Sequence, residues 1–286
     1  MSKTAPTRAT AKAAPGRATS RSVVLKLGGE LIESDEKLDL MGKAIAKAAA
    51  KTQLVIVHGG GREIDAALAQ AGIPKRQVDG LRITDEATLG VVVSVLAGSV
   101  NTKFVAAINA AGGRAVGLTG ADAGVAPVRK AARHQATSGG TVDLGLVGEP
   151  IDAPAPGLIS TLCAAGYIPV IACVSAGRGQ LFNVNADTLA GSLAARLKAH
   201  RLVIAGATLG VLDEQGDTIT TLGRAAMKRL VASGTASAGM VAKLKACAAA
   251  VAGGVPSVSI VDGRDATRLI RATAGLQTDA TTAITN

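Results

Sequence analysis

Two glycine turns, each directly after a run of apolar residues, are the features of this sequence best suited to bind phosphate. Gly28 and Gly29 form the first turn, and Gly59, Gly60 and Gly61 form the second. Glycine has no Cβ, so its backbone N–H group can approach an anion, and a helix that begins after the turn adds the positive end of its dipole. A single glycine turn also serves simply as a tight reversal of the chain. The pair predicts a phosphate site if the two turns meet.

Two lysines could supply positive charge at such a site. Lys26 lies at the end of the strand before the first turn, and Lys243 lies one turn into a helix that Ser237 opens. Phosphoryl transfer is catalysed mostly by positioning and by cancelling charge on the moving group, so two lysines and backbone N–H groups suffice in principle. A carboxylate acceptor is already an anion near neutral pH, so it needs no general base.

An arginine on a predicted hairpin could bind a carboxylate. Residues 77–84 read QVDGLRIT, in which Asp79-Gly80 is a hairpin-turn signal between short extended segments. The hairpin would carry Arg82, whose planar guanidinium suits bidentate binding of a carboxylate. An exposed ion pair is the alternative role for this side chain.

Polar side chains alternate with apolar ones in the string FNVNAD, just before another predicted helix. Asn183 and Asn185 fall on one side of an extended segment, and Asp187 directly precedes the helix predicted at 188–197. Either Asn185 or Asp187 could cap that helix. These side chains are therefore candidates for a site or for a cap.

Strands and helices alternate along the chain, which predicts an open, mainly parallel α/β sandwich. Expected strands are 22–26, 54–57, 115–118, 168–172, 201–204 and, as the closing strand, 257–261; expected helices are 38–50, 62–71, 85–111, 158–165, 188–197 and one from Ser237. A break of the long helix near Gly98 and a hairpin or lid at 125–148 are also expected. Parallel strands end at one edge of a sheet, so both glycine turns should open there, where α/β proteins bind ligands.

Composition indicates a soluble globular protein in a reducing cytoplasm. Of the 286 residues, 48% are hydrophobic, yet no apolar run approaches the roughly 20 residues that cross a bilayer, so no membrane partner is expected. The three cysteines form no CxxC pair and suit core positions. The three histidines have no metal-ligand spacing, so no protein-bound metal is expected.

The charge of the chain does not indicate nucleic-acid binding. The formal net charge is +10, but residues 1–22 carry five Lys and Arg residues and no acid, and only 1% of the chain is aromatic. Because this segment is rich in Ala, Thr, Ser and Arg and interrupted by prolines, it is expected to be a basic, disordered arm, although an organelle transit peptide has a similar composition.

Three other enzyme classes lack their signatures here. HGGG also occurs in the oxyanion loop of lipases and esterases, but these need a GxSxG elbow, and none is present. A dinucleotide site needs GxGxxG after a strand, where this chain has GGGREI, and the Walker string GxxxxGK[ST] is absent. Phosphate chemistry built on the glycine turns and lysines remains.

The motifs together resemble those of acetylglutamate kinases, a branch of the amino acid kinase family. The matching strings, in the family's order between about residues 23 and 270, are KLGG at 26–29, HGGG at 58–61, GLRIT at 80–84, NADT at 185–188 with Asn183 before it, SAGMVAK at 237–243 and DGR at 262–264. GLRIT together with FNVNAD indicates this branch, because related carbamate, uridylate, glutamate and aspartate kinases differ at these motifs. The resemblance implies a three-layer α/β/α sandwich and ATP-dependent phosphorylation of the side-chain carboxylate of N-acetyl-L-glutamate, a step of arginine biosynthesis.

The resemblance also implies roles for individual residues. Lys26 and Lys243 would be catalytic, and Asp187 would hold both lysines in place. Phosphate or nucleotide would be bound by Gly28, Gly29, Gly206 and Gly210, and the acceptor with the phosphoryl group by Gly59, Gly60, Arg82 and Asn183. Mg²⁺ would arrive bound to ATP rather than to the protein.

The implied organisation is an arm at 1–22 followed by a kinase domain at 23–286. Within that domain, about 23–175 would bind the acyl amino acid and form a homodimer, and about 176–286 would bind the nucleotide. Two departures from the family pattern are present: Ala207 replaces an aspartate of the usual TDxxG turn, and the end of the chain, DATTAITN, lacks the usual GT pair. The first weakens the expected adenosine pocket, and the second puts feedback inhibition by arginine in doubt.

Two alternative functions remain open at this point. One is a sibling kinase for a related acyl amino acid. The other is a catalytically silent domain that senses N-acetylglutamate or arginine, for which altered nucleotide-side residues would be typical. Intact Lys26, Asp187 and Lys243 favour the enzyme, because a sensor has no need of all three.

Overall fold

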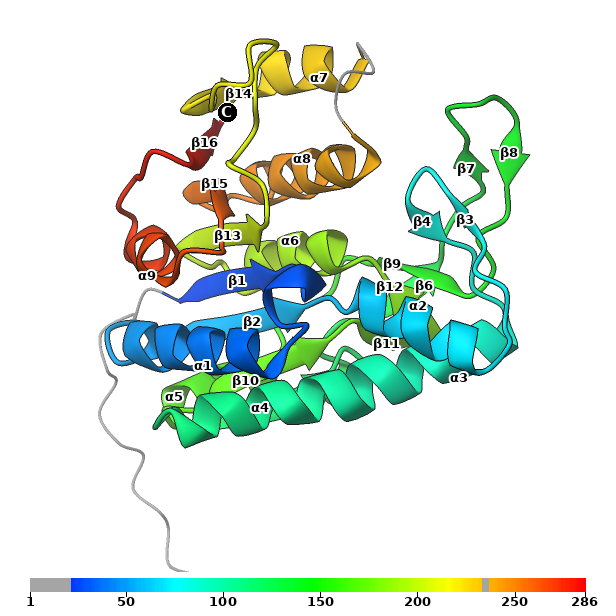
Figure 1. Ribbon diagram of the computed structural model, residues 1–286, viewed down its shortest axis with the longest axis horizontal. Coiled ribbons are helices and arrows are strands. Elements are labelled where there is room, and N and C mark those ends of the chain that lie inside the picture. Colours follow the sequence, from blue (N-terminus) through cyan, green and yellow to red (C-terminus); the bar gives the residue numbers. More distant parts are fainter. Residues whose placement is uncertain (1–21, 233–236) are drawn as a thin grey trace, which may run out of the picture.

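An eight-stranded sheet forms the centre of the computed structural model, which describes residues 22–232 and 237–286 (Figure 1). Its strand order is β14-β16-β15-β13-β1-β2-β10-β5. The strands are β1 (Val23–Leu27), β2 (Leu54–His58), β5 (Ala115–Thr119), β10 (Ile168–Ala172), β13 (Arg201–Gly206), β14 (Thr221–Gly223), β15 (Ser257–Asp262) and β16 (Thr281–Thr285). All neighbours pair in parallel except β15 and β16, which pair antiparallel. The predicted open, mainly parallel sheet is confirmed.

Helices cover both faces of this sheet. On one face α1 (Asp35–Ala49) packs between α4 (Asn101–Ala110) and α9 (Ala266–Ala274), and on the other α6 (Ala186–Arg196) packs on α8 (Ala238–Ala252). The remaining helices are α2 (Gly61–Gln70), α3 (Glu86–Val93), α5 (Gly157–Ala164) and α7 (Arg224–Ala232), with short helices η1 (Gly29–Leu31), η2 (Ser94–Val100) and η3 (Asp122–Gly124). The arrangement is the three-layer α/β/α sandwich expected.

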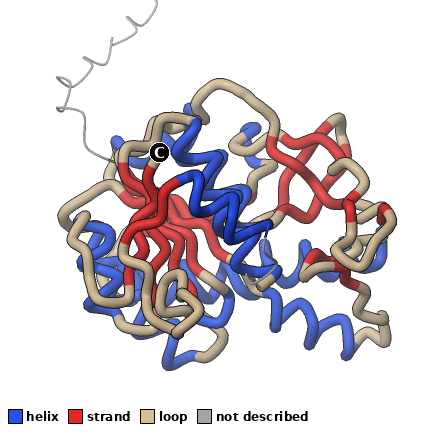
Figure 2. Tube along the Cα trace, turned by 90° about the horizontal axis from the view of Figure 1, so that it is seen from above, coloured by secondary structure: helices blue, strands red, loops and turns tan. Residues whose placement is uncertain are grey.

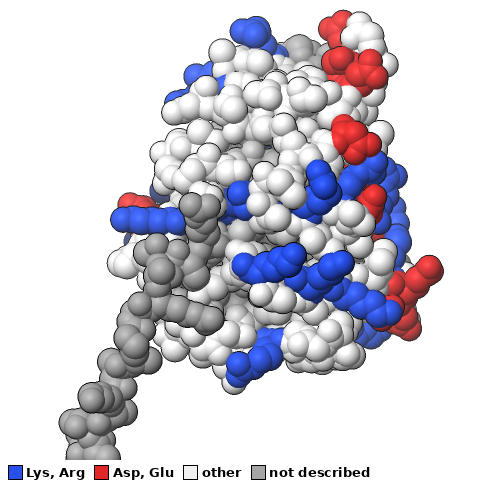
Figure 3. All heavy atoms as spheres, turned by 90° about the vertical axis from the view of Figure 1, so that its left-hand side faces the viewer, with Lys and Arg blue, Asp and Glu red and all other residues white. Residues whose placement is uncertain are grey.

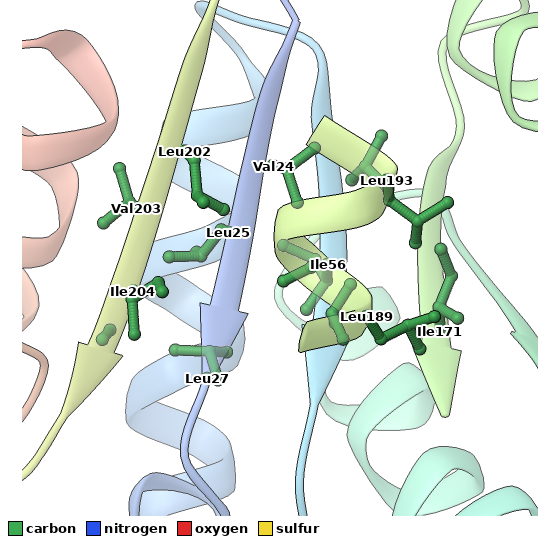
Figure 4. Close-up of a cluster of buried hydrophobic side chains, with 14 of the residues drawn as sticks. Val24, Leu25, Leu27, Ile56, Ile171, Leu189, Leu193, Leu202, Val203 and Ile204 are labelled. Atoms are coloured by element: carbon green, nitrogen blue, oxygen red, sulfur yellow. The ribbon is translucent and has the colours of Figure 1, made fainter. Parts of the chain in front are cut away.

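The core lies between the sheet and these helices. Every residue of β1 and β2 is buried, as expected for parallel strands covered on both faces. Leu189 and Leu193 of α6 lie against Val24, Ile56 and Ile171 of three neighbouring strands (Figure 4). Because alternate residues of a strand face the same side, Lys26 shares the α6 side with Val24.

A second, four-stranded sheet stands apart from the main sheet (Figure 2). Its order is β11 (Val174–Gly177), β12 (Gln180–Val184), β9 (Val147–Pro150) and β6 (Val128–Lys130). The prediction of a hairpin or lid at 125–148 was therefore wrong in part. Val125, Ala126 and Val128 are buried in the core, and only β7 (His134–Gln135) and β8 (Thr141–Val142) form a projecting hairpin.

The two projecting hairpins are joined to each other. The predicted hairpin is present as β3 (Gln77–Val78) and β4 (Leu81–Arg82), beside β7 and β8 (Figure 1). Asp79, in the turn of the first, accepts hydrogen bonds from the Thr137 N–H at 2.9 Å and from the His134 Nε2 at 2.7 Å. A hydrogen bond from the Thr137 hydroxyl, followed by those from His134 and the Thr137 N–H, lowers the pKa of Asp79 to about 2, so the carboxylate that joins the hairpins stays ionised.

Residues 86–110 form one long helix rather than two. Where a break was expected near Gly98, the chain continues through the π-helix η2 into α4. By length and composition alone this helix could cross a membrane: 18 consecutive residues of it have a mean hydropathy of 1.8, and 39% of that stretch is buried inside the protein. Phe104 and Ile108 are fully buried in the core. Such apolar helices also occur in the cores of soluble proteins.

The end of the chain is part of the sheet. The strand at 257–261 was expected to close it, but β16, within the residues that depart from the family pattern, adds an antiparallel strand beside β15. The proposed arm falls almost wholly on residues 1–21, outside the described residues. The three cysteines are buried, as predicted, and burial raises the pKa of Cys163 to about 11 and that of Cys173 to about 12, so neither is a reactive thiolate.

Candidate active site

The two glycine turns meet at the carboxyl ends of β1 and β2. These strands are parallel neighbours, with Leu27 opposite His58, so the chain leaves both at the same edge. A Cβ atom on Gly29 would lie 2.9 Å from the Cα of Gly60. Real Cβ atoms do not approach backbone so closely, which explains why glycine is needed at this position. The expectation that both turns open at one edge is confirmed.

Some N–H groups of the turns are already paired with backbone carbonyls. The Gly28 N–H donates to the Ala205 carbonyl at 3.0 Å, and the Gly59 N–H donates to the Leu27 carbonyl at 3.0 Å. Within the described ranges, the N–H groups of Gly29 and Gly60 have no backbone acceptor. Of the four glycines in these two turns that are expected to bind the ligand, Gly29 and Gly60 are therefore the ones with N–H groups available to it.

Lys26 and Asp187 form a buried ion pair beside the turns. The Lys26 Nζ lies 2.9 Å from the Asp187 Oδ1, and the two side chains are 7% and 8% exposed. The Asn185 Oδ1 accepts the Thr188 N–H at 3.0 Å and caps α6, which settles the choice of cap and leaves Asp187, in the first turn, free to face β1. Its carboxylate also gains from the positive end of the α6 dipole.

Lys243 joins this pair from α8. Its side chain is partly buried, and its pKa is lowered by that burial and by the charge of Lys26, while Asp187 and Glu30 oppose the shift. A Cβ atom on Gly206, at the end of β13, would lie 3.5 Å from the Lys243 Cε. One polar centre thus forms at the ends of β1, β2 and β13. It contains two lysines and one aspartate, and the positive charge of the lysines suits a polyanion.

Arg82 is held beside the second glycine turn with one nitrogen unpaired. Its Nη2 donates to the Asp65 Oδ1 at 2.5 Å and to the Gly61 carbonyl at 3.3 Å. Its Nη1 is buried and has no hydrogen-bond partner among the described residues. An unpaired buried guanidinium nitrogen suits the carboxylate of a ligand.

Asn183 is linked to the same hairpin. Its Nδ2 donates to the Thr84 Oγ1 at 3.2 Å, and that hydroxyl donates to the Arg82 carbonyl at 3.2 Å. The structure therefore links the Asn183 side chain, through Thr84, to the backbone of Arg82, the other residue predicted to bind the acceptor. Gly210 is different: a Cβ there would lie 2.7 Å from the Thr282 Oγ1 of β16, and no contact described joins it to Lys243.

Sequence reasoning missed a carboxylate inside the site. The Glu30 Oε1 accepts the Ala207 N–H at 3.2 Å and lies 3.2 Å from where a Cβ of Gly206 would be. A Cβ on Gly28 would collide with the same carboxylate. Glu30 thus bridges the first glycine turn and the turn in which Ala207 departs from the family pattern. Its place directly after Gly29 was the one signal in the sequence.

Many basic side chains lie far from this site. Figure 3 shows Lys and Arg on the face that includes the start of β1, at the opposite end of the strands from the glycine turns. In the part of the chain that the structure describes, no three His, Cys, Asp or Glu residues are placed to hold a metal ion.

Comparison with known sequences identifies relatives over most of the chain. The sequence profile described as "Amino acid kinase family" matches residues 21–262. An acetylglutamate kinase from Geotalea daltonii is 39% identical over 253 residues, which are 87% of this chain and 86% of that protein. An acetylglutamate kinase from Parvibaculum lavamentivorans is 42% identical over 255 residues, which are 87% of this chain and 83% of that protein.

Solved structures share the fold. A protein from Streptococcus mutans matches with a TM-score of 0.74 and 26% identity, covering 93% of this chain and 98% of that one. An N-acetylglutamate synthase from Neisseria gonorrhoeae, solved with coenzyme A and N-acetyl-glutamate, matches with a TM-score of 0.78 and 23% identity, covering 93% of this chain and 59% of that one. The second likeness concerns the fold alone.

Proposed function

The chain belongs to the amino acid kinase family, and from that premise we propose that it is an acetylglutamate kinase. It transfers the terminal phosphoryl group of ATP to the side-chain carboxylate of N-acetyl-L-glutamate, which gives N-acetyl-L-glutamyl 5-phosphate in arginine biosynthesis. Relatives of that name at about 40% identity over 87% of the chain support this function. The observation that carries the proposal is the buried Lys26–Asp187 pair beside Lys243 at two touching glycine turns.

The chemistry follows from the charges at this centre. An oxygen of the acceptor carboxylate attacks the terminal phosphorus, and the bond from phosphorus to the bridging oxygen of ADP breaks. Lys26 and Lys243 stabilise the negative charge on the transferring group and on the departing ADP. Asp187 keeps both ammonium groups oriented without neutralising the site. The Gly29 and Gly60 N–H groups supply further donors, and no side chain has to remove a proton.

Binding of the two substrates is divided between the two lobes in this proposal. Residues 23–175 hold most of the acyl amino acid, with Arg82 on a carboxylate, and Asn183 reaches it from the start of the second lobe. The rest of residues 176–286 holds ATP, with Gly206 at the phosphates and Gly210 in the turn that follows. Mg²⁺ enters with ATP, because this ion is usually bound through nucleotide phosphates and water.

We further infer a cytoplasmic homodimer. The long helix 86–110 exposes small and weakly polar residues on one side: Gly90, Ser94, Gly98 and Thr102 are exposed and Val91, Ala97 and Val105 partly exposed. A second copy of this helix could pack closely against such a face. Light scattering that gives the mass of one chain would overturn the dimer.

The direct test is ADP release with N-acetyl-L-glutamate and MgATP, with hydroxylamine to trap the acyl phosphate as a hydroxamate. Hydroxamate formed in proportion to ADP supports the kinase. Parallel assays with acyl derivatives of related amino acids separate a sibling kinase from this one. Binding of N-acetylglutamate in calorimetry without any turnover would instead support a sensor.

A further inference from the structure

A histidine is fully buried directly beneath the second glycine turn. His58 is the last residue of β2 and is 0% exposed, with its ring edge-on to Phe104 at a centroid distance of 6.1 Å. Burial lowers its pKa to about 4, so the imidazole is neutral at physiological pH. It has no access to a ligand, so any role in the reaction is exerted through its neighbours.

Two hydrogen bonds fix the tautomer of this ring. The Nδ1 lies 2.9 Å from the Gly59 carbonyl, which can only accept, so Nδ1 carries the hydrogen. The Nε2 then has a free lone pair and accepts the Asn101 Nδ2 at 3.0 Å. The imidazole therefore donates to the glycine turn and accepts from α4.

Asn101 is itself held from both sides. Its Nδ2 also donates to the Val170 carbonyl of β10 at 3.0 Å, and the residue is 5% exposed. A Cβ on Gly117 of β5 would collide with its Oδ1, so the glycine leaves the space that the amide fills. Asn101 begins α4 directly after the π-helix η2, and Leu96 and Val100 of η2 pack against Gly60. π-Helices frequently occur at functional sites.

The peptide geometry connects this pair to the chemistry. The Gly59 carbonyl and the Gly60 N–H belong to one planar trans peptide, so they point in opposite directions. A hydrogen bond that holds the carbonyl toward the protein interior therefore directs the Gly60 N–H outward, and that N–H has no backbone acceptor within the described ranges. Donation to the carbonyl also polarises the peptide and strengthens the N–H as a donor.

We propose that His58 and Asn101 are positioning residues that orient the Gly59–Gly60 peptide, so that the Gly60 N–H is aimed at the acceptor carboxylate and the phosphoryl group it receives. This inference rests on the proposed kinase function. It adds two buried side chains that orient one hydrogen-bond donor of the site, the Gly60 N–H. Neither residue touches substrate.

Two variants of His58 distinguish the role of its Nδ1 from that of its Nε2. Asn at position 58 places an amide N–H close to where Nδ1 was, and Gln places an amide close to where Nε2 was. His58→Asn should therefore keep the donor to Gly59 and lose about as much kcat/KM for N-acetylglutamate as Asn101→Ala, about tenfold, because both lack the contact between positions 58 and 101. His58→Gln lacks the donor to Gly59 itself and should lose about 100-fold. The KM for MgATP should stay unchanged in all three.

A matched control distinguishes positioning from stability. Asn109, also on α4, donates to the Ala115 carbonyl at 3.3 Å and accepts the Ala115 N–H at 2.6 Å, two turns away from the site. Asn109→Ala should lower the melting temperature, as Asn101→Ala should, but leave kcat/KM unaltered. Equal kinetic losses in Asn101→Ala and Asn109→Ala, or in His58→Asn and His58→Gln, would overturn the inference.

A measurement on the unaltered protein tests the inference even if the variants do not fold. Long-range ¹H–¹⁵N correlation at pH 7 should show His58 with a protonated Nδ1 and an unprotonated Nε2. The opposite tautomer, or a ring protonated at both nitrogens, would refute the inference. Absence of turnover in the unaltered protein would refute the kinase function, and the tautomer would still be read independently.

Discussion

A Cβ atom on Gly29 would lie 2.9 Å from the Cα of Gly60, so the two glycine turns touch through their backbones. This contact is possible because β1 and β2 are parallel neighbours in register to their ends. It makes the separation of the turns, and with it the spacing of their N–H groups, sensitive to a single methyl group.

Gly29→Ala should therefore separate the turns. We expect a loss of kcat/KM of about 100-fold or more, because misplaced donors no longer meet the transferring group, and a loss of stability of about 1–3 kcal/mol from overpacking. Gly157→Ala is the control, since a Cβ there meets nothing within 4 Å. Steady-state kinetics and urea denaturation measure both effects, and a fully active Gly29→Ala protein would contradict the proposed cradle.

Removal of either site lysine should abolish most activity. Lys26→Ala and Lys243→Ala are each expected to lower kcat by about 100-fold or more, because each removes a positive charge that acts on the transition state. Lys245→Ala is the matched control: it lies on the same helix as Lys243, two residues on, and is exposed. The hydroxamate assay reads the result, and a loss in the control equal to that in Lys243→Ala would remove the basis for a specific role.

Arg82 should act on binding of the acyl amino acid. Its unpaired Nη1 leads us to expect that Arg82→Ala raises the KM for N-acetylglutamate about tenfold or more and leaves the KM for MgATP unchanged. Arg76→Ala on the same hairpin is the control, because Arg76 is exposed and pairs with Asp85 at 2.6 Å. If both KM values rose together in Arg82→Ala, the hairpin would have a general structural role.

The main sheet was readable in the sequence because its central strands are continuous apolar runs. The prediction for β10 agrees with its observed bounds, and those for β1 and β2 agree within one residue. β16 was missed because TTAIT contains few strongly apolar residues and is recognised as a strand only beside β15. β6 and β9 were missed because they are short and are stabilised by pairing with distant segments.

In the site, too, some residues can be recognised from the local sequence and others only from contacts between distant segments. Lys26, Asp187, Lys243, Arg82 and Asn183 carry side chains whose chemistry can be inferred from type and motif. Asn101 offers no such signal: its partner His58 lies 43 residues away, and its second acceptor, the Val170 carbonyl, lies 69 residues away. Glu30 could not be separated from a surface acid, because its contact with Ala207 spans 177 residues.

Stability should depend on pH through His58. Burial lowers its folded-state pKa from 6.5 to about 4, so between those values the unfolded chain binds a proton that the folded protein does not. The contribution of His58 to the free energy of unfolding is therefore fully present above pH 6.5 and is lost as the pH falls toward 4. Between pH 7 and pH 5 the loss is about 2 kcal/mol.

The measurement is the free energy of unfolding at pH 5, 6 and 7 for the unaltered protein and for His58→Asn. The variant lacks the group, so its stability should fall less over this range by about 2 kcal/mol. The other titrating groups are common to both proteins and cancel in the difference. Parallel curves for the two proteins would show that His58 is not buried in its neutral form.

The position of β1 has a consequence for how the protein is made. β1 is completed near residue 27, but one of its two neighbours in the sheet, β13, begins only at Arg201. During synthesis, this strand leaves the ribosome long before that partner exists, and until then one of its edges offers unpaired backbone groups to any other chain nearby. Pairing over such a sequence distance is slow. Yield in the cell should therefore depend on chaperones that shield the early chain, and truncation before β13 should produce aggregates rather than a smaller folded unit.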